Sequence, residues 1–238
     1  YIALRNLTRA RFQAAQNLSR EKTRFLDTLF YKFSALDSSK VFSDTFGATS
    51  IAVISEFFSI DDINDMPLEK LADFIAQKGK NKFADPEQIA AELKAAARSS
   101  YRLSKTVNDS VNQLLAVRMI GIKSIQQQVK DLDKAIESYM QLFPDILTSI
   151  PGIGPVYSAG ILAEIADIYR FKNHPALAKY AGITWTRYQS GDFEAANTRL
   201  ILVDSFGQQI PKVLFLGSCE QGTMHDAEFK RYYLTKFK

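Results

Sequence analysis

The sequence contains very few residues that could bind a metal or form a disulfide. Its 238 residues include one cysteine, Cys219, and two histidines, His174 and His225, which lie far apart in the chain. A single cysteine excludes a disulfide framework within this chain and a cysteine-based zinc site. Two distant histidines also argue against a histidine-rich metal centre. The residues of this chain therefore predict no metal site and no bound cofactor of their own.

Long hydrophobic runs are absent as well. No apolar stretch approaches the roughly 20 residues that a membrane-spanning helix requires, so we expect neither an integral membrane protein nor a membrane partner. Apolar residues make up 46% of the chain and charged residues 24%, which is typical of globular proteins. The net charge is +4, a value that permits a nucleic-acid partner without requiring one.

Two long segments have the periodicity of amphipathic helices. Apolar residues recur at steps of three and four over residues 2–36, and again from residue 86 to about residue 143. The second segment starts at Asp85-Pro86-Glu87, a strong helix start, and is too long for one ordinary globular helix. We therefore predict one or two helices of a coiled-coil-like hairpin there, packed against helix 2–36 or against a second subunit.

The remaining pattern predicts a mainly α fold in two domains. Residues 38–83 indicate a small helical insertion with short helices at 51–58 and 68–77. Glycines, prolines and short elements replace long helices after Pro144, so we place a boundary at 143–146. Residues 1–143 then form the coiled-coil-like region, and residues 144–238 form a compact helical domain. The basic residues of the first helix form either a solvated face or a stripe that faces phosphates: Arg5, Arg9, Arg20, Lys22 and Arg24.

The motif that points most clearly to function is the Ile-Pro-Gly-Ile-Gly stretch at 150–154, which precedes a helix predicted at 156–165. This pattern is typical of a helix-hairpin-helix DNA-binding element, although an ordinary tight turn between helices would also fit. The glycines allow a tight turn, and the free amides at the start of the second helix can face a phosphate. Gly152, Ile153 and Gly154 are therefore candidate DNA contacts.

Further candidates follow this motif. Arg170, Lys172, Arg187 and Arg199 could contact phosphates or could be ordinary surface charges. His174 precedes Pro175 at the start of a short helix predicted at 175–180 with Gly182 beyond its end, and we expect His174 to be a cap or a surface group. Ser190, before Gly191, is by itself typical of a turn, since no Ser/His/Asp spacing supports a hydrolase triad.

Three elements in one order carry a resemblance to a known family. They are the hairpin at 150–154, the block from Phe171 to Tyr180-Ala181-Gly182-Ile183, and Gln189-Ser190-Gly191. Together they resemble the C-terminal transposase domain of the "one-ten" insertion-sequence family, whose DEDD-type transposases are related to the Piv DNA invertases. The resemblance covers about 145–202 and 224–238, and the long helices are similar, less specifically, to the coiled-coil region of that family.

The resemblance implies a recombinase that cleaves and rejoins DNA. It implies an N-terminal RuvC-like domain with an Asp-Glu-Asp-Asp set that binds Mg²⁺, and a serine that forms a covalent intermediate with DNA. By its place in the Gln-Ser-Gly motif, that serine corresponds to Ser190. The resemblance also implies DNA as a partner and, in some members, a guide RNA encoded by the element. We further expect a homo-oligomer formed through the long helices and a bacterial cytoplasmic location associated with the nucleoid.

The chain departs from the family pattern in two ways. The first residue is Tyr1, and the acidic half is absent, so no metal ligand can be assigned and we expect a truncated copy that is inactive by itself. Between about 203 and 223 the family's Gly-Asn-Arg-Tyr-Leu-Arg and Glu-Ala-Ala-Asn stretches are missing. Residues 206–211 and 217–221 can be encoded by codons that, when the reading frame is shifted by one base, encode these family motifs instead. We therefore hypothesise two compensating frameshifts, near 203 and near 223, a hypothesis that the gene sequence would test.

Three functions remain open at this point. The first is transposition or site-specific recombination, in a copy that is inactive by itself. The second is non-enzymatic DNA binding through the helix-hairpin-helix element alone. The third is a structural coiled-coil scaffold without a DNA role, which binding that weakens steeply with salt would contradict.

Overall fold

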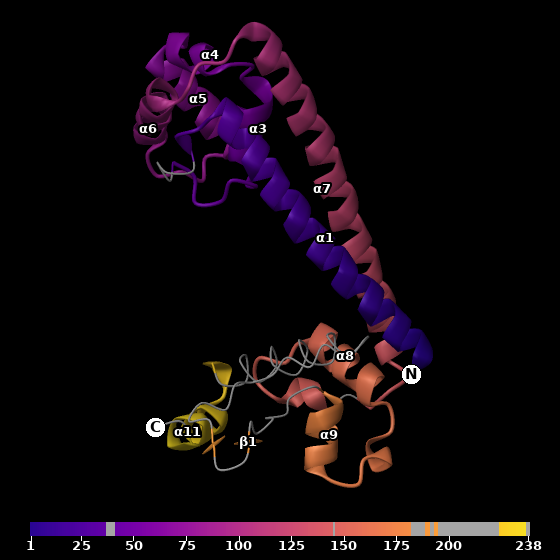
Figure 1. The fold of residues 1–238 in the computed structure, drawn as a ribbon. Helices are drawn as coiled ribbons and strands as arrows, with labels where there is room; N and C mark the ends of the chain where they lie inside the picture. Colours follow the sequence, from indigo (N-terminus) through magenta and orange to yellow (C-terminus); the bar gives the residue numbers. More distant parts are fainter. Residues whose placement is uncertain (37–40, 145, 182–188, 191–192, 195–223, 237–238) are drawn as a thin grey trace. The chain divides into compact units, whose positions relative to one another are not determined.

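The computed structural model describes residues 1–36, 41–144, 146–181, 189–190, 193–194 and 224–236. These residues are mainly helical, which confirms the predicted fold class (Figure 1). One short antiparallel ladder among them pairs β1 (Gln189–Ser190) with β2 (Phe193–Glu194). The chain divides into two compact units, one formed by Tyr1–Gln16 and Gln127–Lys238, the other by Asn17–Gln126. The domain boundary at 143–146 stays a prediction.

The two longest helices, α1 (Ile2–Lys32) and α7 (Lys105–Met140), contribute to both units. In the Asn17–Gln126 unit, Arg118 of α7 donates hydrogen bonds to the Glu21 carboxylate at 2.9 Å and to the Thr28 hydroxyl at 3.0 Å. In the other unit, the Arg11 guanidinium donates to the Asp133 carboxylate at 2.9 Å. Side-chain bonds therefore join α1 to α7 within each unit.

The long helical segment predicted from residue 86 forms two helices. The first is α6 (Pro86–Ser99), whose predicted cap is confirmed because the Asp85 side chain accepts a hydrogen bond from the Gln88 amide. The helix ends at buried Ser100, where no glycine or proline marks a break. The Ser100 hydroxyl donates to the Ala96 carbonyl at 2.9 Å and accepts from the Ala35 amide at 3.1 Å. A tertiary contact at Ser100 thus accompanies the helix end.

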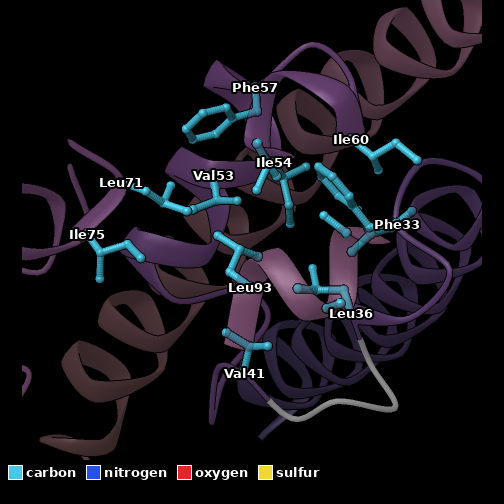
Figure 2. Close-up of a cluster of buried hydrophobic side chains, with 14 of the residues drawn as sticks. Phe33, Leu36, Val41, Val53, Ile54, Phe57, Ile60, Leu71, Ile75 and Leu93 are labelled. Carbon is cyan, nitrogen blue, oxygen red and sulfur yellow. The ribbon is translucent and has the colours of Figure 1, made fainter. Parts of the chain in front are cut away.

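The Asn17–Gln126 unit has its own hydrophobic core (Figure 2). Between α1 and α6 the chain forms α3 (Ala48–Glu56), α4 (Ile60–Asp65) and α5 (Leu68–Lys78), so the predicted insertion is helical. A capping box between Ser59 and Asp62 starts α4. The core side chains labelled in Figure 2 come from α3 and its C-cap, from α4, α5 and α6, and from the segment that follows α1: Phe33, Leu36, Val41, Val53, Ile54, Phe57, Ile60, Leu71, Ile75 and Leu93.

A buried lysine, Lys32, forms a hydrogen bond with a residue of this core. Lys32 is 3% exposed, and its ammonium donates to the Ile54 carbonyl and to the Asn112 side-chain oxygen, both at 2.6 Å. Burial lowers the pKa of Lys32 from 10.5 to about 8, and the charge of Asp62 opposes this shift. The folded state therefore releases this proton at a lower pH than the unfolded chain does.

This shift predicts a pH dependence of stability. Between pH 8 and pH 10.5 the unfolded chain binds more protons at Lys32, so the free energy of unfolding should rise with pH across this window, by about 3 kcal/mol in total. Denaturant unfolding at several pH values, compared with the Lys32→Met variant, isolates the contribution of this residue. An equal pH profile in both proteins would contradict the assignment.

The other unit contains the short elements that follow α7. They are η1 (Leu147–Ser149), α8 (Pro155–Ile165), η2 (Ile168–Arg170), α9 (His174–Tyr180) and α11 (Ala227–Lys236). Leu4 of α1, Ile136 and Met140 of α7 and two alanines of α8 form a small core that fixes α8 in this unit. Across the described parts of the chain, every helix is too short or too polar to cross a membrane.

Candidate nucleic-acid interface

The predicted hairpin at 150–154 is a tight turn. The Ile153 amide donates to the Ile150 carbonyl at 3.0 Å, which closes a four-residue turn with Pro151 and Gly152 at its centre. Gly152 has φ 91°, the left-handed conformation that glycine adopts without strain at this turn position, and proline suits the position before it. Ile153 is buried, so its side chain anchors the turn to the protein. The two central residues, Pro151 and Gly152, are exposed.

The turn leads directly into the start of α8. Gly154 is the N-cap, Pro155 is the first helical residue, and neither a side-chain cap nor an acidic residue in the first turn compensates the helix dipole. The first helical bond runs from the Ser158 amide to the Gly154 carbonyl at 3.0 Å. A Cβ atom added to Gly154 would meet nothing within 4 Å. Packing against the described chain therefore does not require glycine at this position.

The helix-hairpin-helix element itself stays a prediction. The helix after the turn starts at Pro155, one residue before the predicted start. The segment before the turn is a single 3-10 turn, η1, rather than an extended first helix. The feature that the structure places at this site is thus an exposed Pro-Gly turn followed by an uncapped helix start.

A buried carboxylate lies near the end of α8. Glu164 is fully buried, and its two carboxylate oxygens accept from the Arg9 guanidinium at 2.7 and 2.9 Å. This hydrogen bonding raises the pKa of Arg9. Arg5 lies 3.5 Å from the same carboxylate and donates to the Ala163 carbonyl at 2.9 and 3.1 Å. A buried charge requires such partners, so these contacts hold α8 against α1.

This ion pair corrects both interpretations for Arg5 and Arg9, whereas Arg20 and Arg24 are exposed, as a solvated face requires. Arg5 and Arg9 form neither a solvated face nor a stripe that faces phosphates, because they bind Glu164 and its helix end. Lys22 lies 4.7 Å from the centre of the Phe46 ring, and Arg24 pairs with Glu21 at 3.3 Å. The pairing of α1 with Glu164 could not be found from local patterns, since 155 residues separate Arg9 from Glu164.

The same helix end positions Arg170. The Tyr180 hydroxyl donates to the Glu164 carbonyl at 3.1 Å, which fixes the Tyr180 ring. The Arg170 guanidinium lies 4.5 Å from the centre of that ring and 4.6 Å from the centre of the Phe171 ring. Arg170 is exposed, and no carboxylate of the described chain pairs with it. Aromatic rings thus orient a cation that remains open to solvent.

The residues around α9 occupy the positions expected of a short capped helix. The Asn173 side chain accepts from the Ala176 amide at 3.0 Å and is the N-cap, so His174 is an exposed surface group rather than the cap. Lys172 is exposed in the preceding loop. The C-cap is Ala181, and Gly182, which we predicted beyond the end of this helix, lies outside the described residues.

Several of the predicted site residues lie partly or wholly outside the residues that the structure describes. Ser190 lies in β1, where it is opposite Phe193 of β2. Arg187, Arg199, Cys219 and the segment 203–223 lie outside the described residues. The assignments of Ser190 as nucleophile and of Arg187 and Arg199 as phosphate contacts therefore stay predictions, as does the frameshift hypothesis.

The described residues do not fit the Mg²⁺ site that the family resemblance implies. Such a site needs several carboxylate oxygens at one place. Across the described parts of the chain, no three His, Cys, Asp or Glu side chains are grouped so that they could hold a metal ion. The buried carboxylate of Glu164 already binds two arginines.

Comparison with known proteins finds one family and two relatives to which this chain is similar. Residues 144–234 match the transposase IS116/IS110/IS902 family. The chain is 28% identical, over 66% of its length and 39% of the relative's, to a 44.8 kDa protein of insertion element IS116 from Streptomyces clavuligerus. It is 36% identical, over 38% of its length and 23% of the relative's, to a Streptomyces coelicolor protein assigned as the mini-circle transposase for IS117. No solved structure matches the chain.

The chain thus spans about two fifths and about one quarter of these two relatives. The matches confirm the predicted resemblance at the level of an insertion-sequence transposase family. The RuvC-like domain, the acidic set and the relation to Piv invertases stay predictions. Residues 144–234, which include the turn, α8 and the Arg170 cluster, are therefore similar to the transposase domain of the IS116/IS110/IS902 family.

Proposed function

We propose that residues 144–238 bind DNA phosphates within a transposase that cleaves and rejoins DNA. The observation that carries the proposal is the uncapped start of α8 after an exposed Pro-Gly turn, inside the residues that match the transposase family. Free backbone amides and the positive end of the helix dipole attract phosphate oxygens without reading the base sequence. The turn and the helix start would therefore position DNA rather than select its sequence.

Cationic side chains near α9 would extend this contact. Arg170 presents a guanidinium that two aromatic rings orient, and Lys172 is exposed two residues further along. A guanidinium can bind a phosphate with two parallel hydrogen bonds, whereas an ammonium acts as a point charge. We assign Arg187 and Arg199 the same role from their place in the sequence.

The proposed strand exchange uses Ser190 as the nucleophile. Its hydroxyl oxygen would attack a DNA phosphorus, a bond from phosphorus to a deoxyribose oxygen would break, and the reverse reaction would rejoin a strand without ATP. Because the described residues form no cluster of metal-binding side chains, we propose that this chain by itself binds DNA and that cleavage requires the acidic domain that the resemblance implies. Non-enzymatic DNA binding is the second candidate, favoured by the same observation.

We also propose two further partners, namely a second copy of this chain and a guide RNA. Four apolar side chains are exposed on one broad side of α7, namely Val107, Leu114, Val117 and Ile120. Such a face is suited to packing against a second long helix, which supports the proposed homo-oligomer. Sedimentation velocity would test self-association, and a monomer at all concentrations would contradict the proposed homo-oligomer.

The proposed guide RNA has a separate test. Competition between DNA and RNA for binding to the chain would measure it.

A charge introduced at Gly154 tests the binding site. Gly154 has φ −80° and ψ 172°, an extended conformation that any residue adopts, and the space around it is open. Aspartate is a good N-cap, so Gly154→Asp should keep or slightly raise helix stability, by a few tenths of a kcal/mol. Its carboxylate would nevertheless occupy the place proposed for a phosphate, and DNA affinity should fall roughly tenfold.

The matched control is Gly154→Asn, which has the same shape and capping ability without the charge. Fluorescence anisotropy with a labelled duplex measures both variants beside the unmodified chain. The proposal requires the Asp variant to bind more weakly than the Asn variant. Equal DNA affinities for the Asp and Asn variants would remove the start of α8 from the interface.

A further inference from the structure

A cavity lies in the Asn17–Gln126 unit, far in sequence from the residues that match the transposase family. Its volume is about 670 Å³, within the range of small-molecule sites. Its lining comes from the residues just before α3, the first turn of α3, the end of α5 with the loop that follows it, and Ile89 of α6. All of these residues belong to one unit.

The start of α3 offers unpaired backbone amides to this cavity. Gly47 is the N-cap and supplies no side chain, and the first turn has no acidic residue. The Ile51 amide makes the first helical bond, to the Gly47 carbonyl at 3.0 Å. The amides of Ala48, Thr49 and Ser50 have no acceptor among the described residues. All three residues line the cavity, so an anion placed there would meet these donors.

A buried hydroxyl at the same place also lacks a partner. Ser50 lines the cavity and is 1% exposed, yet its Oγ has no hydrogen-bond partner among the described residues. Buried hydroxyl groups in folded proteins are nearly always hydrogen-bonded, because an unpaired one destabilises the folded state. An acceptor oxygen of a ligand in the cavity would satisfy this group. Ser50 is therefore an observation that points to a ligand independently of the helix start.

The charge of the lining favours an anion. Lys78, Lys80 and Lys82 line the cavity, and Asp44 is the one acidic residue among its lining side chains. Glu56 binds Lys78, whereas Lys80 and Lys82 pair with no carboxylate of the described chain. The cavity therefore combines two unpaired cations, three free amides and one unpaired hydroxyl.

From this arrangement we infer that the cavity binds a phosphate group. Phosphate carries several acceptor oxygens and negative charge, which match the amides, the Ser50 hydroxyl and the two lysines. The phosphate could come from free inorganic phosphate or from a nucleic-acid backbone, since both present the same chemistry. The inference does not depend on DNA binding by residues 144–238.

The test uses the full chain and inorganic phosphate as the probe. Isothermal titration calorimetry gives the affinity, and thermal unfolding in phosphate and in chloride at equal ionic strength gives the shift in Tm. Phosphate should raise the Tm of the unmodified chain. The Lys80→Ala/Lys82→Ala variant should bind phosphate roughly tenfold more weakly. The matched control is Lys70→Ala/Lys105→Ala, which removes two exposed lysines of the same unit outside the cavity.

Ser50→Ala gives a second, independent readout. Removing an unpaired buried hydroxyl should raise the Tm without phosphate and reduce the further gain that phosphate causes. No Tm shift with phosphate in the unmodified chain would overturn the inference, and so would equal phosphate affinities for the cavity variant and its control. An unchanged phosphate gain in Ser50→Ala would also overturn it.

A single-stranded oligonucleotide then identifies the source of the phosphate. If it displaces inorganic phosphate from the unmodified chain, the site takes a nucleic-acid backbone, and if it does not, the site takes free phosphate. Either result supports the site, provided that the double-lysine variant loses phosphate binding. Lys80→Ala/Lys82→Ala alters the cavity and Gly154→Asp alters the start of α8, so failure of this site and failure of the proposed DNA interface are distinguishable.

Discussion

Replacing Arg9 with leucine is expected to destabilise the folded chain by about 2–4 kcal/mol. The change leaves the fully buried Glu164 carboxylate without the two hydrogen bonds at 2.7 and 2.9 Å that now satisfy it. Breaking a buried ion pair typically costs about 3–5 kcal/mol. We expect a smaller loss because the Arg9 side chain is 38% exposed and Arg5 stays near the same carboxylate. Denaturant unfolding monitored by circular dichroism measures this loss.

Two further variants separate a buried charge from ordinary packing. Arg9→Leu/Glu164→Leu removes both charges and should recover much of the lost stability, because no unpaired buried carboxylate remains. Arg11→Leu is the matched control, since Arg11 pairs with Asp133 where both side chains are partly exposed, and it should change stability by less than about 1 kcal/mol. If Arg9→Leu and Arg11→Leu were equally mild, the Glu164 contact would not hold α8 to α1.

Replacing Ser190 with alanine is expected to abolish strand transfer in the proposed complete enzyme, which would combine this chain with the acidic domain that the resemblance implies. Loss of a covalent nucleophile removes the reaction path itself, and rates fall by about 10⁴-fold or more in comparable cases. DNA affinity should stay nearly unchanged, because Ser190 lies in β1 and not in the turn or at the start of α8. Strand-transfer assays and anisotropy measure the two quantities separately.

A trapping experiment makes this test specific to the covalent step. Denaturing gels of reactions with end-labelled DNA should show a protein–DNA adduct for the unmodified enzyme and none for Ser190→Ala. Full strand transfer by the alanine variant would exclude Ser190 as the nucleophile. The fold would then support the second candidate, non-enzymatic DNA binding.

Local rules predicted the elements that local chemistry determines. The Asp85 cap, the tight turn at Gly152 and the start of α8 next to Gly154 each depend on residues a few positions apart. The turn and the helix start determine where the candidate nucleic-acid interface lies in the chain. The family resemblance, confirmed over residues 144–234 at the level of an insertion-sequence transposase family, supplied its interpretation.

Features that depend on distant partners could not be predicted in this way. The end of α6 at Ser100 coincides with a hydrogen bond from the Ala35 amide, 65 residues away, and no glycine or proline marks it. The role of Arg9 depends on Glu164, and the burial of Lys32 depends on the Ile54 carbonyl and Asn112. Periodicity can place such residues on a helix face, but it does not identify the polar group that faces them.

The salt dependence of DNA binding tests the central claim most directly. The affinity of the chain for a labelled duplex should be measured by anisotropy between 50 and 200 mM salt, as the slope of log K against log salt. Each lost phosphate contact reduces this slope by about 0.9. Arg170→Ala/Lys172→Ala should therefore reduce it by about 2, while Lys130→Ala/Lys134→Ala, which removes two exposed charges of α7, should leave it unchanged. Binding that does not change with salt, or equal slopes for the two variants, would contradict a phosphate-binding surface in residues 144–238.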